Sequence, residues 1–206
     1  MRLGIFGGTF DPIHNAHLFV AESARLSEGL DRVLFVPTNS QHYRDKAHAG
    51  VEHRCAMILG AIANNANFAL DDTDLRAEAT GFTADLLPRL AERYPGDAFT
   101  FIIGADSLVN TAWVRFDEVL ESLERFVIAP RPGVRADALG RVLEALPGRL
   151  RDRVSTLNSP EIPESASAIR ALLAQGRSVR YLVPESVWQY IVSQKLYGRD
   201  AIESNS

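Results

Sequence analysis

The sequence has 206 residues, of which 46% are hydrophobic and 23% are charged, and its formal net charge at pH 7 is −4. This composition is typical of a globular chain and excludes a disordered or fibrous one, while the acidic balance argues against a general nucleic-acid binder. The single cysteine, Cys55, excludes an intrachain disulfide and fits a reducing compartment. No apolar run approaches the roughly 18 residues that cross a membrane, and the N-terminus lacks a signal-peptide pattern, so we expect a cytoplasmic protein.

The chain begins with a short apolar run at residues 3–6, which predicts a buried strand. Gly7 and Gly8 follow it, and after a short loop two histidines, His14 and His17, lie at the start of a helical pattern. Paired glycines let the backbone approach a ligand closely, and the start of a helix leaves backbone N–H groups unpaired. This strand, loop and helix therefore predict a phosphate-binding site, with the two histidines as donors beside it.

Strand and helix signals alternate along the rest of the chain. Apolar runs predict strands at residues 32–36, 68–70, 99–103, 126–129 and 154–157. Helical spacing predicts helices at residues 52–64, 81–94, 136–146, 168–175 and 184–194. The pattern indicates an α/β fold, a Rossmann-like doubly wound parallel sheet with helices on both faces and a small C-terminal helical segment. No linker interrupts it, so we expect a single domain over residues 1–198 and a polar tail over residues 199–206.

In such sheets, ligands bind beyond the carboxyl ends of the strands, at the point where the strand order reverses. The loops that follow residues 6, 36, 103 and 129 should therefore meet. Near the C-terminus, Ser165, Ser167 and Arg170 surround the start of a predicted helix. Hydroxyls, free backbone N–H groups and a guanidinium at one helix start make a second candidate for phosphate binding.

Two segments carry a resemblance to a known family. Residues 8–17, GTFDPIHNAH, resemble the first signature of the nucleotidyltransferases with paired histidines (the HxxH superfamily), and residues 165–170, SASAIR, resemble their second signature. Within this superfamily the chain is most similar to the bacterial nicotinate-nucleotide adenylyltransferases. The similarity covers essentially the whole chain and includes His53 and Arg54 before a helix, residues 99–107 and Trp113.

The resemblance implies an enzyme that transfers the adenylyl group of ATP to nicotinate mononucleotide, forming nicotinate adenine dinucleotide and pyrophosphate in NAD biosynthesis. The attacking phosphate is already anionic, so catalysis should come from orientation and from neutralising the charge that develops on the triphosphate. The resemblance also implies Mg²⁺ carried with ATP and held mainly by phosphate and water rather than by a metal site of the protein. The expected partners are ATP and nicotinate mononucleotide, without nucleic acid or membrane, in a monomer or a homo-oligomer.

The same resemblance assigns roles to individual residues. The expected catalytic residues are His14, His17 and Arg170. The expected ATP-binding residues are Gly8, Thr9, Phe10, His14, His17, Gly104, Asp106, Ser165, Ser167, Ile169 and Arg170. The expected residues of the mononucleotide site are Thr38, Asn39, Arg44, Lys46, Phe82, Thr83 and Trp113.

Departures from the family pattern fall mainly on the acceptor side. The family often has a Pro-Pro-His-Lys-like segment in the stretch 38–46, and it usually has Tyr where this chain has Phe82. The alternatives are therefore the same chemistry on nicotinamide mononucleotide or phosphopantetheine, or a non-catalytic nucleotide-binding regulator. The polar loop 38–49 is also a candidate for a lid over the substrate. A zinc site at the two histidines is a further alternative, but no nearby cysteine or obvious third ligand completes it.

Overall fold

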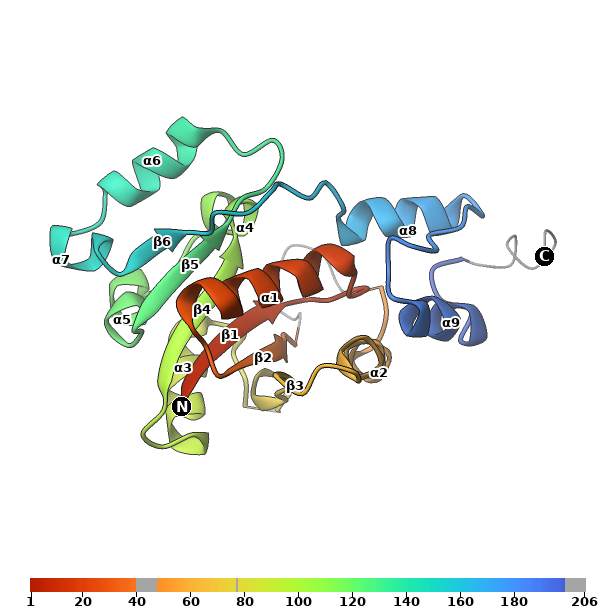
Figure 1. The fold of residues 1–206 in the computed structure, drawn as a ribbon, viewed down its shortest axis with the longest axis horizontal. Coiled ribbons are helices and arrows are strands. Elements are labelled where there is room, and N and C mark those ends of the chain that lie inside the picture. Colours follow the sequence, from red (N-terminus) through yellow and green to blue (C-terminus); the bar gives the residue numbers. More distant parts are fainter. Residues whose placement is uncertain (40–47, 77, 199–206) are drawn as a thin grey trace.

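One sheet of six parallel strands forms the centre of the protein (Figure 1). The computed structural model describes residues 1–39, 48–76 and 78–198. The strands are β1 (Arg2–Gly8), β2 (Arg32–Pro37), β3 (Phe68–Leu70), β4 (Ala98–Gly104), β5 (Arg125–Ala129) and β6 (Val154–Thr156). Their order across the sheet is β3-β2-β1-β4-β5-β6, which is the doubly wound arrangement expected from the alternation of strand and helix signals.

Helices cover both faces of this sheet. They are α1 (Asn15–Glu28), α2 (Val51–Ile62), α3 (Thr83–Arg93), α4 (Ala105–Asn110), α5 (Phe116–Glu121), α6 (Ala136–Glu144), α7 (Gly148–Arg151), α8 (Ala166–Ala174) and α9 (Glu185–Ser193), with a short 3₁₀ helix, η1 (Thr73–Leu75). One apolar cluster joins the sheet to α1, α2, α8 and α9, and a second joins its other face to α3, α4, α5, α6 and α7. Neighbouring strand residues alternate between the clusters, since Phe35 belongs to the first and Leu34 to the second.

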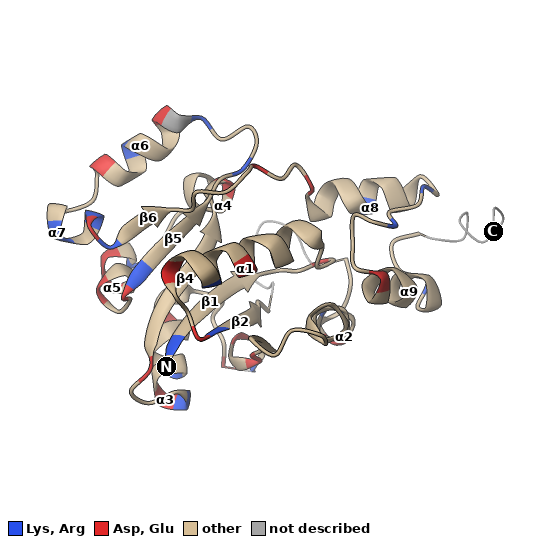
Figure 2. Cartoon of the chain, in the orientation of Figure 1, with Lys and Arg blue, Asp and Glu red and all other residues tan. Residues whose placement is uncertain are grey.

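The charged residues of the strands are confined to their first positions. Arg2, Arg32 and Arg125 begin β1, β2 and β5, and the rest of each strand carries no charge (Figure 2). Strands of a parallel sheet are buried on both faces and therefore consist of continuous apolar runs, which is why they could be found from the sequence. No helix among the described residues is long and apolar enough to cross a membrane.

The strand order reverses between β1 and β4. The chain runs outward from β1 to β2 and β3, and then it returns to the other side of β1 for β4, β5 and β6. Phe6 of β1 lies between Phe35 of β2 and Ile102 of β4 in the sheet register. The loops that leave β1 and β4 turn toward opposite faces, and a crevice opens between them at the carboxyl edge of the sheet.

The short helices were not expected from the sequence. Four of the elements, η1, α4, α5 and α7, have only three to six residues, and such segments are too short to show a helical period. The helix α3 continues through Pro88, which lies on its exposed side. The expected tail, residues 199–206, lies outside the described residues.

Candidate active site

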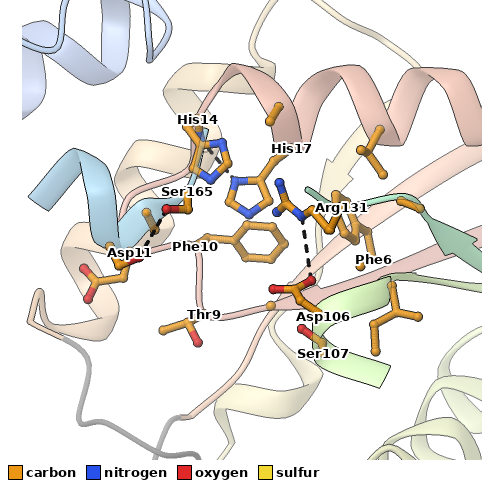
Figure 3. Close-up of a pocket in the computed structure, with 18 of the residues that line it drawn as sticks. Phe6, Thr9, Phe10, Asp11, His14, His17, Asp106, Ser107, Arg131 and Ser165 are labelled. Atoms are coloured by element: carbon orange, nitrogen blue, oxygen red, sulfur yellow. Dashed lines mark hydrogen bonds and ion pairs between the residues drawn. The ribbon is translucent and has the colours of Figure 1, made fainter. Parts of the chain in front are cut away.

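A cavity of about 420 Å³ opens at the carboxyl edge of the sheet, where the strand order reverses (Figure 3). Its walls come from the loops after β1, β4 and β5 and from the start of α8. The convergence of these loops was predicted from the strand pattern alone. Of the residues expected to bind ATP, those that line this cavity are Gly8, Thr9, Phe10, His14, His17, Gly104, Asp106, Ser165, Ser167 and Arg170.

The two histidines lie one above the other at the start of α1. His14 is the N-cap residue, and its backbone N–H donates to Nδ1 of His17 over 3.2 Å. The ring centroids of His14 and His17 are 3.7 Å apart. Because Nδ1 of His17 accepts this bond, a neutral His17 ring carries its proton on Nε2. The backbone of the helix start therefore sets the tautomer of His17 and leaves an N–H donor on Nε2.

Both histidine rings are neutral at pH 7. Burial lowers the pKa of His14 to about 3, and the positive charge of Arg131 lowers it further in the same direction. Burial, followed by the electrostatic effects of His14 and Arg131, also holds the pKa of His17 well below its usual value. The rings can therefore donate and accept hydrogen bonds without adding charge to the cavity, and its positive charge comes from arginines.

The start of α8 supplies the opposite wall of the cavity. Oγ of Ser165 accepts from the backbone N–H of Ala168 over 3.2 Å, so Ser165 is the N-cap of α8, at the helix start that the sequence predicted near this serine. Oγ of Ser167 lies 3.1 Å from Oγ of Ser165. Nη1 of Arg170 donates to the backbone carbonyl of Asp11 over 2.7 Å, which ties α8 to the loop after β1. Two hydroxyls, a helix start and a guanidinium thus face one cavity, which suits phosphate.

Arg131 is a residue of this cavity that the sequence interpretation missed. It lies just beyond β5, with Nε 3.7 Å from Oδ1 of Asp106, and its Nη1 donates to the carbonyl of Glu164 over 3.2 Å. These two side chains also lie close to Gly104, since a Cβ there would be 2.5 Å from Oδ1 of Asp106 and 3.3 Å from Nε of Arg131, so a larger residue would require the Asp106 carboxylate to shift. The signal was available, since Arg131 is in the loop after the fifth strand, which was expected to reach the site.

A second cavity, of about 150 Å³, adjoins the first. Gly7, Gly8, Thr9, Ile103 and Ser107 line both cavities, so the two share a wall. Three residues expected at the mononucleotide site, Thr38, Thr83 and Trp113, line the second cavity.

One polar group of the second cavity lacks a partner among the described residues. Nε1 of Trp113 is buried without a hydrogen bond there. Asp74, which the sequence interpretation missed, is the only charged side chain among the described lining residues, and burial raises its pKa. An unpartnered indole N–H favours a ligand that offers a hydrogen-bond acceptor.

Some of the expected site residues are not brought to the cavity walls. Ile169 is on the side of α8 that packs against the sheet, with 1% of its surface exposed, and so it belongs to the core. Phe82 and Asn39 line neither cavity, and Phe82, the N-cap residue of α3, is 37% exposed while its neighbour Thr83 points to the site. Arg44 and Lys46, with most of the loop proposed as a lid, lie outside the described residues.

A buried carboxylate stabilises the loop after β1. The Asp11 carboxylate accepts from the backbone N–H groups of His48 and Ala49, over 2.7 and 3.2 Å, and from the Tyr197 hydroxyl over 2.5 Å. Burial raises the pKa of Tyr197, so its hydroxyl stays protonated and donates to Asp11. Asp11 thus joins three segments that are distant in the sequence.

Comparisons with known proteins agree with this geometry. The chain matches the cytidylyltransferase-like family over residues 5–189. It is 42% identical over 206 residues to the "Probable nicotinate-nucleotide adenylyltransferase" of Rubrobacter xylanophilus, which covers 98% of this chain and 94% of that protein. A protein of the same name from Geobacter sulfurreducens is 39% identical over 219 residues, covering 97% of this chain and all of the relative.

Solved structures show the same fold. Plasmodium falciparum nicotinic acid mononucleotide adenylyltransferase complexed with NaAD superposes with a TM-score of 0.78, at 22% identity and over 97% of this chain and 98% of that one. The same enzyme complexed with APC gives a TM-score of 0.76 at 23% identity, with the same coverage of both chains.

Proposed function

The chain belongs to the cytidylyltransferase-like family, among the nicotinate-nucleotide adenylyltransferases, and from that premise we propose that it transfers the adenylyl group of ATP to nicotinate mononucleotide. It is a nucleotidyltransferase. The products of the proposed reaction are nicotinate adenine dinucleotide and pyrophosphate, which places the enzyme in NAD biosynthesis. The chain has a single cysteine, which fits a reducing compartment, and we infer that the enzyme acts in the cytoplasm.

The observation that supports this function best is the wall that the two cavities share. A triphosphate fits the first cavity, where Arg131, Arg170 and the start of α8 face the histidines. A mononucleotide fits the second cavity beside Trp113, and its phosphate would meet the α-phosphate of ATP at Gly8 and the other shared residues. Two substrates held end to end in this way need little further motion to react.

The proposed reaction forms one bond and breaks one bond at the α-phosphorus. An oxygen of the mononucleotide phosphate attacks this phosphorus, and the bond to the oxygen that bridges the α- and β-phosphates breaks, so that pyrophosphate leaves with the electron pair. The attacking oxygen is already anionic, so no general base is required. We assign the donor at the α-phosphate to Nε2–H of His17, and contacts with the β- and γ-phosphates to Ser165, Ser167 and Arg170.

The remaining roles follow from position in the two cavities. Gly104 and Asp106 would contact the adenosine, and Thr83 and Trp113 would contact the pyridine ring. Among the described residues, no group of three or more His, Cys, Asp or Glu side chains could hold a metal ion. From the family resemblance we propose that Mg²⁺ enters on the triphosphate, with phosphate oxygens and water as its main ligands, and that it would screen the phosphate charge there.

A pyrophosphate-release assay with ATP, Mg²⁺ and one acceptor at a time tests this function. We expect release with nicotinate mononucleotide to exceed release with nicotinamide mononucleotide or phosphopantetheine by at least about tenfold in kcat/KM, which corresponds to roughly 1.4 kcal/mol of discrimination. Faster release with another acceptor would overturn the proposed substrate, and release with none of the three would favour a nucleotide-binding regulator.

A further inference from the structure

The guanidinium of Arg54 connects the loop after β1, which forms part of the shared wall of the cavities, with the loop after β2, which lines the second cavity. Arg54 is on α2, and only 1% of its surface is exposed. Its Nη1 donates to the backbone carbonyl of Thr9 over 2.7 Å, and its Nη2 donates to the backbone carbonyl of Thr38 over 3.0 Å. Thr9 follows β1 and Thr38 follows β2, so a single side chain bridges two loops of the site. Arg54 itself lines neither cavity, and it therefore acts from behind the loops.

The bond to Thr9 determines which way the next peptide group faces. In a trans peptide the C=O and the following N–H point in opposite directions, so holding the Thr9 carbonyl turns the N–H of Phe10 away from Arg54. Phe10 has a φ of 50°, in the left-handed region that residues with a side chain rarely adopt. Its ring packs against Phe6 and against His17, with centroid distances of 5.6 and 5.0 Å. The loop is thus held in an unfavourable conformation by Arg54 on one side and by ring packing on the other.

Packing alone does not explain an arginine at this position. Burial lowers the pKa of the guanidinium, and the nearby Asp11 carboxylate acts in the opposite direction, so Arg54 remains charged. Burying a charge is costly, and an unbranched apolar side chain would fill a similar space. Only the planar fork of arginine offers donors to two carbonyls of separate loops at once. A backbone bond from Thr38 N–H to the Gly8 carbonyl, over 3.0 Å, already joins the loops, and Arg54 fixes their spacing at a second point.

We propose that Arg54 is a positioning residue for adenylyl transfer, which sets the distance between the loop under ATP and the loop under the acceptor. The inference rests on the proposed function, because it assumes that the two reacting phosphates meet at the shared wall, to which Thr9 belongs, with the acceptor in the cavity that Thr38 lines. A displacement of about 1 Å between reacting groups can cost on the order of 10²-fold in rate without much effect on the binding of either substrate.

Two substitutions at Arg54 and one elsewhere test this role. Arg54→Met keeps the length and removes both donors, while Arg54→Lys keeps the charge but cannot reproduce the fork. Arg153→Met is the matched control: Nη1 of Arg153 also bonds to backbone carbonyls, those of Leu120 and Glu121 over 3.5 and 3.2 Å, but it does so away from both cavities. Each variant is assayed about 20 °C below its own measured Tm, so that the folded enzyme is compared.

The expected result is a loss of kcat with little loss of affinity. We expect kcat to fall about 10²-fold in Arg54→Met and about 10-fold in Arg54→Lys, while calorimetric Kd values for a non-hydrolysable ATP analogue and for nicotinate mononucleotide, each alone, change less than about 3-fold. Arg153→Met should lower the Tm and leave kcat unchanged.

Two outcomes would decide against the role. A kcat within about 3-fold of wild type in a folded Arg54 variant would overturn it, as would a kcat loss in Arg153→Met equal to that in Arg54→Met. If Arg54→Met does not fold, Arg54→Lys decides the question by the same criterion. A wild-type enzyme that releases no pyrophosphate with nicotinate mononucleotide refutes the proposed function instead, so the two failures are distinguishable.

Discussion

His17 provides the sharpest test of the proposed chemistry, because its two ring nitrogens have separate tasks. Nδ1 accepts from the backbone N–H of His14 over 3.2 Å, and Nε2–H is left to donate in the cavity. Asparagine at this position places an amide oxygen near the location of Nδ1 but has no donor near Nε2. Glutamine places an amide N–H near Nε2 and loses the acceptor near Nδ1. His17→Asn therefore keeps the structural hydrogen bond at Nδ1 and removes the proposed catalytic donor at Nε2, whereas His17→Gln does the opposite.

The expected loss of kcat in the His17 variants follows from the type of hydrogen-bond donor that is removed. Removing one preorganised donor from a site of developing charge typically costs roughly 10² to 10³-fold in kcat, or about 2.7–4 kcal/mol. We expect losses of this size in His17→Ala and in His17→Asn, although His17→Asn keeps the helix cap and should unfold at the wild-type temperature. His17→Gln should remain within about 10-fold of wild type in kcat, since it retains the donor.

The assay is pyrophosphate release at saturating ATP, Mg²⁺ and acceptor, together with thermal unfolding of each variant. His53→Asn is the matched control, because His53 bonds to the Tyr190 hydroxyl over 3.0 Å and lines neither cavity. Wild-type turnover in His17→Asn would refute the assignment of the donor to Nε2. Equal turnover in His17→Gln and His17→Ala would show that a donor near the position of Nε2 is not enough to restore kcat.

Two further predictions concern stability. Burial lowers the pKa of His14 from 6.5 to about 3, so between these values the unfolded chain binds more protons and the free energy of unfolding falls as the pH falls. The loss from His14 alone should be about 2 kcal/mol between pH 7.5 and pH 5, and urea denaturation should show a smaller loss in His14→Asn; an unchanged loss would refute the reasoning. Tyr197→Phe removes the donor to Asp11 and should cost about 2 kcal/mol, whereas Tyr181→Phe, at a residue that is 84% exposed, should be neutral by the same measurement.

The sheet was predictable because a parallel strand has to be apolar along its length. The runs at residues 32–36 and 99–103 lie within β2 and β4, and the reversal of strand order between β1 and β4 follows the rule for doubly wound sheets. The helices α4 and α5 were missed because six residues do not establish a helical period. The helix α3 was predicted in spite of Pro88, since a proline on an exposed side removes one backbone bond without disturbing the buried side.

The residues of the site also divide into those that could be predicted from the sequence and those that could not. Those in signatures or at helix starts, such as His14, His17 and Ser165, could be named from the sequence, and the structure places them together in one cavity. Asp74 was not named, and Arg54 was named for the resemblance alone without a role, because the importance of both depends on contacts with chain segments that are distant in the sequence. A charge between apolar residues is more often at the surface, and only the fold shows that these two side chains are buried.

The charges of the two cavities indicate how the work of catalysis is divided. The triphosphate and the acceptor phosphate bring several negative charges to one wall, and both histidines are neutral because burial lowers their pKa. Among the described residues that line the first cavity, positive charge therefore comes from Arg131 and Arg170, and the helix starts and Mg²⁺ would contribute further. On the proposed assignment, His17 contributes a directed N–H rather than a charge, and an N–H aimed at the α-phosphate is useful only if the loop below it is fixed. The neutrality of His17 and the buried fork of Arg54 thus have one explanation, since a catalyst that relies on neutral donors depends on their exact placement.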